Sequence, residues 1–300
     1  MKIISLKDNW PSRLSGDGGR RFMKLTILIA YSWLCVVRVA DSQGIADINE
    51  RMMQSTFLVT DEARHGCGTG FVIEKRQTNG IGHVFVTAEH VLASLSGETA
   101  VILLRVSTGP DKWVAAPCTN RIRQGTNTLY TKHPTMDVAA FYLAIPENCQ
   151  KLQMPEDWLL TEEVIRGIKI GPGTELLNLG YPFCQTSQGE NFPLLRSGRI
   201  ASYPILPVAE RSSFELAITV FGGNSGGPVY LSNYEEPGAQ FTVPLRRHFG
   251  VVGMLTTSRV TTFTSQSLDE TVIKQINLGF AGVIHAQFIK ETIDLLPKYW

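Results

Sequence analysis

The sequence carries almost no excess charge of either sign. Its 28 Lys and Arg residues nearly balance 27 Asp and Glu residues, which leaves a formal net charge of +1 at pH 7. Proteins that bind nucleic acid, or that attract acidic substrates over a distance, usually present a clear basic excess. The balance therefore argues against nucleic acid as a partner.

The sequence also lacks an N-terminal apolar run long enough to cross a bilayer. The uncharged stretch Leu25–Val37 has 13 residues, whereas a membrane-spanning helix needs about 20. Thirteen residues suit the apolar region of a secretory signal, and Arg20, Arg21 and Lys24 supply the basic residues that precede such a region. An uncleaved membrane anchor and a buried helix of the fold are the alternatives.

Small residues mark a cleavage site after the apolar run. Ala40 and Ser42 occupy the positions at which a signal peptidase prefers small side chains, so we expect cleavage before Gln43. Residues 1–42 are then a signal peptide and residues 43–300 an exported chain, secreted or periplasmic, without stable membrane insertion. Met23 offers an alternative translation start.

No C-x-x-C pair occurs among the five cysteines, which argues against a zinc site of that type. Removal of the signal peptide takes away Cys35 and leaves four cysteines. An even number in an exported chain is compatible with two disulfides in any of three pairings, or with buried free thiols. We expect neither a metal nor another cofactor. The four remaining cysteines are Cys67, Cys118, Cys149 and Cys184.

Helical periodicity is missing over most of the chain, which disfavours a parallel α/β sheet. Short segments rich in Val, Ile, Leu, Phe and Thr alternate with turn residues, and the chain has 27 Gly and 15 Pro. Many strands at this spacing predict an all-β barrel or sandwich architecture. The candidate strands are 70–74, 84–87, 100–106, 138–143, 175–179, 214–220, 228–231, 251–255 and 280–284.

Two segments interrupt the strand pattern. Residues 146–173 lack alternation and end in Gly-Pro-Gly, so we interpret about 147–173 as a linker, with some helix around 161–166, between two β halves. After the final strand, residues 286–296 place apolar side chains at helical spacing, which predicts an amphipathic helix.

Three motifs carry residues suited to nucleophilic catalysis. His90 follows the apolar strand Val84–Thr87, and Asp137 precedes another apolar strand 47 residues later. Ser225 lies a further 88 residues on, inside the glycine-rich segment Gly222–Val229. A serine hydroxyl needs an adjacent base to attack a carbonyl, histidine can accept and return that proton, and a carboxylate can orient the histidine.

The glycines around Ser225 allow a tight turn and a close backbone approach. They would let the backbone N–H groups of Gly223 and Ser225 point at a developing oxyanion. One such donor typically contributes about 10²–10³ in rate.

The motifs resemble those of the chymotrypsin-like serine proteases, and they occur in that family's order. The resemblance covers residues 56–296, nearly the whole exported chain, through the segments 68–71, 87–90, 137–139, 223–228 and 250–253. It implies two antiparallel six-stranded β-barrels at about 56–146 and 174–285, with the helix 286–296 after them. It also implies that His90 is the general base, Asp137 its orienting carboxylate and Ser225 the nucleophile.

Departures from the family pattern refine the comparison. Asn224 stands where the trypsin branch has an aspartate that pairs with a newly cut N-terminus, so activation by that salt bridge is not expected. Val91 replaces a cysteine that often follows the catalytic histidine, so that disulfide is absent. The C-terminal pattern looks more like the bacterial HtrA-type branch, and no PDZ domain is expected after the last helix.

The resemblance also indicates a specificity pocket. Thr219, six residues before the nucleophile, would lie at its base, and no carboxylate stands there to pair with a Lys or Arg side chain of the substrate. We therefore expect a small or medium apolar side chain to be preferred in a protein or peptide substrate. Residues expected near the pocket walls are Val220, Gly253, Met254 and Leu255.

Two other functions compete with an endopeptidase. Gly223-x-Ser225-x-Gly227 also matches the nucleophile elbow of serine esterases, for which Asp269 and His285 would complete the order; however, residues 226–231 are typical of a strand rather than the helix that an elbow requires. A catalytically inactive protease-like binding module is the other alternative. The sequence does not predict an oligomeric state.

Overall fold

The computed structural model describes residues 48–77, 80–149, 153–187, 190–235, 247–266 and 271–298. All of them belong to one compact unit, Asp47–Trp300. The predicted signal peptide lies outside the described residues. Among the described helices, none is both long enough and apolar enough to span a bilayer.

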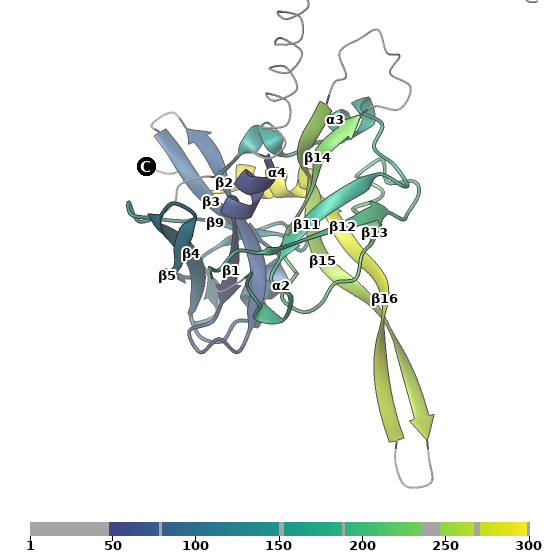
Figure 1. The fold of residues 1–300 in the computed structure, drawn as a ribbon, viewed down its shortest axis with the longest axis horizontal. Helices are drawn as coiled ribbons and strands as arrows, with labels where there is room; N and C mark the ends of the chain where they lie inside the picture. The colour runs from purple at the N-terminus through teal and green to yellow at the C-terminus, as the bar shows by residue number, and fades with distance from the viewer. Residues whose placement is uncertain are drawn as a thin grey trace, which may run out of the picture. The chain divides into compact units, whose positions relative to one another are not determined.

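Within the described residues, the main sheet of the first half does not close. Its hydrogen-bonded order is β5-β4-β1-β2-β3-β9-β8, and β10 adds a parallel pairing with β2. Figure 1 labels β1 to β5 and β9 of this sheet. The strands are β1 (Thr56–Thr60), β2 (Cys67–Gln77), β3 (Gly80–Thr87), β4 (Thr99–Gly109), β5 (Lys112–Arg121), β8 (Thr131–Lys132), β9 (Ala139–Tyr142) and β10 (Met154–Pro155). Two short strands, β6 (Arg123–Gln124) and β7 (Asn127–Thr128), form a separate pair.

The antiparallel six-stranded barrel predicted for residues 56–146 is found only in part. Its strands pair antiparallel, but the described sheet has eight strands, of which β10 comes from the predicted linker, and no pairing joins the edge strands β5 and β8 within the described residues. The physical reason lies in those edges, because β8 is only two residues long and most side chains of β5 are exposed or half-buried. Neither edge offers a long, buried partner that would close the sheet.

The second half is a closed six-stranded antiparallel barrel, as predicted. Its strand order is β11-β12-β13-β16-β15-β14. The strands are β11 (Glu175–Gly180), β12 (Leu194–Ile200), β13 (Ser213–Ala217), β14 (Pro228–Glu235), β15 (Arg247–Gln266) and β16 (Thr271–His285). β15 and β16 continue beyond the barrel as a long two-stranded hairpin (Figure 1).

Short helices connect and flank the two halves. Residues 48–55 are helical, and α2 (Glu89–Ser94) follows β3 directly. The segment predicted to be a linker contains β10, the 3-10 turn η1 (Glu156–Trp158) and α3 (Glu162–Gly167). Another 3-10 turn, η2 (Pro182–Cys184), follows β11.

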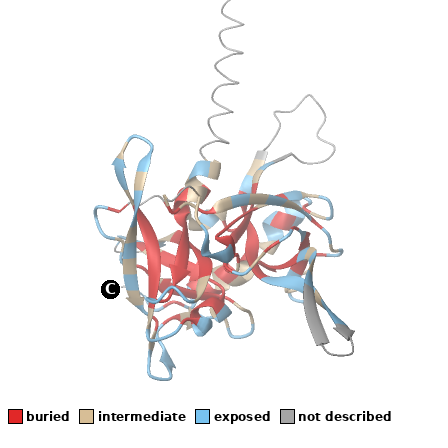
Figure 2. Cartoon of the chain, turned by 60° about the horizontal axis from the view of Figure 1, so that its bottom comes forward, coloured by how far each residue is buried: buried red, intermediate tan, exposed pale blue. Residues whose placement is uncertain are grey.

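The predicted C-terminal helix is present as α4 (Ala286–Asp294) and connects the two halves. It follows the last strand of the barrel, yet Ile289 and Ile293 are buried in the hydrophobic core of the first half. Its C-terminal turn accepts a hydrogen bond from Lys75 in β2, with 2.6 Å between Lys75 Nζ and the Ile293 carbonyl oxygen. Two main clusters of buried apolar residues make up the core, one within the barrel and one centred on the first half that also includes some barrel residues. Figure 2 colours the buried positions of the chain red.

Candidate active site

His90 and Asp137 come together because their strands are neighbours in the first sheet. His90 lies in α2, three residues after β3 ends, and Asp137 lies two residues before β9, which pairs with β3 through Thr87 and Ala139. The His90 Nδ1 and Asp137 Oδ2 atoms are 2.6 Å apart. The His90 backbone N–H also donates to Asp137 Oδ1 at 2.9 Å. Two contacts to one carboxylate fix the position and the orientation of the imidazole.

These contacts shift the pKa of both groups in the directions that an ion pair requires. The hydrogen bond to Asp137 raises the pKa of His90 above 6.5, although partial burial of the ring opposes the shift. Partial burial works against ionisation of Asp137, but the hydrogen bonds from the His90 side chain and backbone together lower the pKa of this carboxyl. Asp137 is thus held as an anion that stabilises a protonated His90.

Ser225 lies in a tight turn that precedes β14. Gly223 and Gly226 have positive φ angles of 94° and 85°, a conformation that strongly favours glycine. A side chain on Gly226 would place Cβ only 2.0 Å from the Thr69 carbonyl oxygen, 2.3 Å from Thr87 Oγ1 and 3.1 Å from the Ala88 nitrogen. The Ser225 turn therefore packs directly against the end of β3 that leads to His90.

The Ser225 hydroxyl has a backbone partner in this conformation. Its Oγ donates to the Thr256 carbonyl oxygen in β15 at 3.3 Å. Among the described residues, the Ser225 hydroxyl makes this hydrogen bond and none to His90. The structure thus brings His90 and Asp137 into direct contact and places Ser225 on the adjoining turn.

The two predicted oxyanion donors are free of backbone partners. Neither the Gly223 N–H nor the Ser225 N–H donates to a backbone carbonyl within the described part of the chain. The Gly222 carbonyl, which precedes the first donor, accepts a hydrogen bond from the Phe183 N–H at 2.7 Å. Within the described part of the chain, neither N–H group is thus committed to a backbone hydrogen bond.

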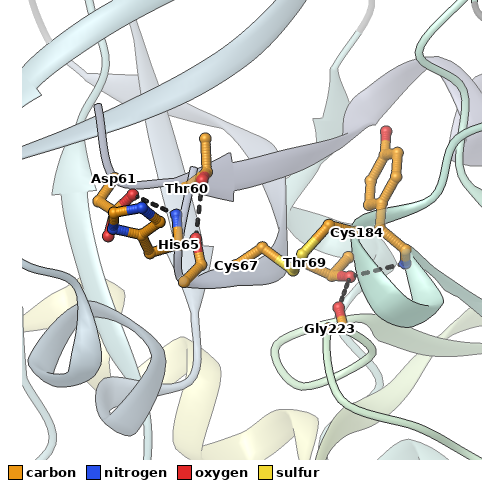
Figure 3. The surroundings of a disulfide bond; sticks show 9 residues. Thr60, Asp61, His65, Cys67, Thr69, Cys184 and Gly223 are labelled. Carbon is orange, nitrogen blue, oxygen red and sulfur yellow. Dashed lines mark hydrogen bonds between the residues drawn. A yellow bond between two sulfur atoms is a disulfide. The ribbon is translucent and has the colours of Figure 1, made fainter. Parts of the chain in front are cut away.

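Thr69 holds the Ser225 turn in place, and its role was not predicted from the sequence; Figure 3 shows its hydroxyl bonded to Gly223. Its N–H donates to the Ser225 carbonyl oxygen at 2.8 Å, and its hydroxyl donates to the Gly223 carbonyl oxygen at 2.7 Å. The same hydroxyl oxygen accepts the Tyr181 N–H at 3.1 Å. Thr69 is fully buried. The Gly68-Thr69-Gly70 motif was noted only as part of a family pattern, because nothing local to it shows contacts with residues more than 100 positions away.

A disulfide lies beside the same turn. Cys67 at the start of β2 is bonded to Cys184, with 5.9 Å between the Cα atoms and 117 positions between the residues (Figure 3). A side chain on Gly223 would come within 3.3 Å of Cys67 Sγ. Cys118 and Cys149 are free thiols. The described residues therefore contain one disulfide, whereas the four cysteines were compatible with two.

A buried arginine extends this network to the N-terminal part of the unit. The Arg105 guanidinium donates to the carbonyls of residues 53, 54 and 56, to the Asn191 carbonyl and to the Tyr181 hydroxyl. It lies between the rings of Phe57 and Phe192, at 4.5 and 4.3 Å from their centroids. Arg105 thereby connects residues 53–57 to Tyr181, and through Tyr181 to Thr69.

The residues predicted for the specificity pocket occupy different environments. Thr219 is exposed, and its carbonyl accepts a hydrogen bond from Arg196. The side chains of Val220, Met254 and Leu255 are buried in the hydrophobic clusters. Alternation in a barrel strand sends Met254 and Leu255 to opposite faces, and both faces of β15 are covered at this point. Gly253 packs against the Ile284 carbonyl in β16.

Within the described residues, no three His, Cys, Asp or Glu side chains are grouped as a metal site would require. Asn224, the residue that departs from the trypsin pattern, is buried next to Gly180. Its side-chain amide has no hydrogen-bond partner in the described part of the chain.

Comparison with known families decides how this arrangement is classified. The model of the trypsin-like peptidase domain family matches residues 68–235, which include His90, Asp137 and Ser225. The chain belongs to the trypsin-like peptidase family. No curated protein matches the sequence. Among solved structures, the Rv3671c protease in its inactive form is similar to this trypsin-like chain, with 18% identity and a TM-score of 0.41 over 82% of this chain and 91% of that one.

Proposed function

We propose that this chain is an exported serine endopeptidase in which Ser225, His90 and Asp137 act as nucleophile, general base and orienting carboxylate. The observation that carries the proposal is the 2.6 Å contact between His90 Nδ1 and Asp137 Oδ2, next to the turn that bears Ser225. This contact leaves His90 Nε2 as the nitrogen that can accept a proton from a nucleophile.

The first half of the reaction forms an acyl-enzyme. The Ser225 hydroxyl turns from the Thr256 carbonyl towards His90, and its oxygen attacks the peptide carbonyl carbon while the proton passes to His90 Nε2. The oxyanion that develops accepts hydrogen bonds from the Gly223 and Ser225 N–H groups. His90 then gives the proton to the leaving amine, the peptide bond breaks, and the acyl group remains on Ser225.

The second half returns the enzyme to its starting state. His90 accepts a proton from water, and the resulting hydroxide attacks the acyl carbon. As the ester bond to Ser225 breaks, His90 returns the proton to the serine oxygen. Throughout, the Asp137 carboxylate stabilises the protonated imidazole without itself taking a proton.

The Cys67–Cys184 disulfide supports an oxidising, extracytoplasmic location, because disulfides persist mainly outside the cytoplasm. Thr219, which has no carboxylate, stands at the position that the family resemblance assigns to the base of the specificity pocket. We propose small or medium apolar side chains as the preferred substrate residues there. A peptide-library cleavage profile dominated by Arg or Lys would contradict this preference.

Covalent labelling tests the proposed function. The folded chain should react with a fluorophosphonate and cleave peptides, whereas Ser225→Ala should fold normally, take no label and lose several orders of magnitude in turnover. Ser213→Ala, which changes an exposed serine in β13, is the matched control and should behave like the wild type. A folded wild type that takes no label would indicate an inactive binding module, and a labelled chain that cleaves only esters would indicate an esterase.

A further inference from the structure

One edge of the long β15–β16 hairpin has no partner strand. β14 pairs with β15 only as far as Met254, and the last backbone contacts on that side join Leu255 to Gly226 and Gly227. From Thr257 to Gln266, β15 pairs only with β16 in the described part of the chain. The other edge of this segment therefore presents backbone groups without a neighbouring strand (Figure 1).

This unpaired edge begins at the candidate active site. Thr256, its first residue, accepts the hydrogen bond from the Ser225 hydroxyl. On the second strand of the hairpin, Asn277 Nδ2 donates to the Val220 carbonyl oxygen at 2.6 Å. The base of the hairpin thus contacts both the nucleophile and the segment predicted to form the specificity pocket.

From Val260 onward, the edge lacks the usual protection against strand addition. Natural edge strands are commonly blocked by Lys, Pro, unpaired charges or β-bulges. The register between β15 and β16 is irregular between Leu255 and Thr257 and between Ser258 and Val260, but it is continuous from Val260 to Gln266. Residues 257–264 contain only one charged side chain, Arg259, and its Nε donates to Glu215 in β13 at 2.9 Å. The rest are Thr, Ser, Val and Phe, which favour extended structure. Val260 and Phe263 are exposed.

We propose that the edge formed by residues 259–264 binds an extended segment of the substrate polypeptide as an added antiparallel strand. This proposal rests on the proposed endopeptidase function. β15 runs outward from Ser225, so an antiparallel partner runs inward and reaches Ser225 with its C-terminal end. The bound segment is therefore the part of the substrate that precedes the scissile bond.

The proposal defines the substrate class by length and conformation. Six strand residues cover about 20 Å, so the substrate needs an unfolded stretch well beyond the residues next to the cleavage site. Exposed Val260 and Phe263 favour β-branched or aromatic side chains in that stretch. Backbone hydrogen bonds supply affinity with little dependence on sequence.

The test compares a short peptide with the same peptide extended by about ten residues before the cleavage site. We expect the wild type to show a kcat/KM about 10- to 100-fold higher for the long peptide. A variant in which Asn-Gly replaces residues 261–276 keeps the Val260–Asn277 pair as the new hairpin end. For this variant, the ratio of kcat/KM for the long peptide to kcat/KM for the short peptide should fall to about 1. Its fluorophosphonate labelling rate and its turnover of the short peptide should stay at wild-type values.

A point variant with a matched control avoids large deletions. Phe263 and Ile81 are equally exposed, at 58% each, but Ile81 lies in β3, outside the proposed binding edge. Phe263→Ser should lower the long-peptide kcat/KM, and Ile81→Ser should not. N-methylation of single backbone nitrogens in the extension should reduce cleavage at alternate positions only, because alternate residues of a strand face the enzyme edge.

The remaining outcomes separate this proposal from its rivals. Equal long-to-short ratios in wild type and shortened variant would overturn it. So would a wild-type dimer that dissociates on shortening while the ratio is unchanged, because the edge would then bind a second copy of the chain. If the wild type takes no label, the endopeptidase proposal fails. Binding of the long peptide to the wild-type and shortened chains then decides the hairpin's role: weaker binding on shortening supports strand addition, and equal binding overturns it.

Discussion

Thr69 shows how one side chain can set the geometry of a turn. Its hydroxyl and N–H hold the carbonyls on both sides of Asn224, which belong to the 223–224 and 225–226 peptide units. These units adjoin the ones that carry the Gly223 and Ser225 N–H groups. Under the proposed function, Thr69 is therefore a positioning residue that acts on the two oxyanion donors through the neighbouring peptide units.

Replacement of Thr69 should affect turnover more than substrate binding. Thr69→Val removes the hydroxyl at nearly constant volume, and with it the hydrogen bonds to the Gly223 carbonyl and from the Tyr181 N–H. Loss of the bond to Gly223, about 1–3 kcal/mol, should lower kcat roughly 10- to 100-fold with little change in KM. Thr69→Ser restores the hydroxyl and should recover most of the activity. Steady-state kinetics of both variants check this, and equal kcat values for Val and Ser would contradict it.

The Asp137 carboxylate should determine the acid limb of the pH–activity profile. Because Asp137 raises the pKa of His90, kcat/KM should be lost as pH falls through a value above 6.5, where the imidazole becomes protonated and can no longer act as a base. Asp137→Asn removes the anion, so this limb should move to lower pH and the maximal rate should drop about 10⁴-fold. An unshifted acid limb would show that another group controls ionisation.

At the scale of the elements, the junction between β16 and α4 contains a buried histidine. His285 packs against Phe214 in β13, with 5.1 Å between the ring centroids, and burial lowers the pKa of His285 to about 4. A histidine in the unfolded chain titrates near 6.5. The unfolded state therefore binds the proton first, and stability is lost as pH falls from about 6.5 towards 4.

This titration predicts acid sensitivity that one substitution should remove. Between pH 7 and pH 4.5, His285 should cost the wild type about 2–3 kcal/mol of unfolding free energy. His285→Gln should abolish that part of the pH dependence, whatever its effect on stability at pH 7. Urea denaturation at both pH values measures it, with exposed His65→Gln as the control. Identical pH dependence in the wild type and His285→Gln would contradict the prediction.

The hairpin also shows which elements the sequence could not reveal. Strands of the barrel were predictable because burial imposes an apolar pattern on them, and β11, β13 and β14 follow it. The predicted strands 251–255 and 280–284 leave the hairpin out, whereas β15 runs to Gln266 and β16 starts at Thr271. Among the described side chains of the hairpin beyond the barrel, none is buried in a core, so its sequence need not alternate between apolar and polar residues.

At the scale of the whole molecule, contacts distant in sequence decided what could be predicted. His90, Asp137 and Ser225 could be proposed because each lies in a local motif with recognisable chemistry. Arg105 gave no such signal, because its partners are backbone carbonyls 49 to 86 positions away. Whether the first sheet closes into a barrel depends on whether its two edge strands pair, and the composition of a single strand does not encode that pairing.

The Cys67–Cys184 disulfide should be a major source of stability. It joins positions 117 residues apart, and a loop of that length corresponds to about 4–5 kcal/mol of unfolded-state entropy in the chain-entropy description. The double variant Cys67→Ser/Cys184→Ser should lose a large part of this unfolding free energy, measured by denaturant titration. Cys118→Ser, which changes a free cysteine, is the control, and an equal loss in both variants would contradict the prediction.

The same disulfide also determines what a single cut in the backbone would do. Cys67 lies in the first sheet and Cys184 follows the first strand of the barrel. A nick anywhere in the connection between Tyr142 and Glu175 would therefore yield two polypeptides that remain one covalent particle. Such a nicked chain would keep the mass of the intact chain, apart from the added water, until a reducing agent released its fragments. A hydrolytic cut between the two halves would therefore leave both fragments joined by the disulfide.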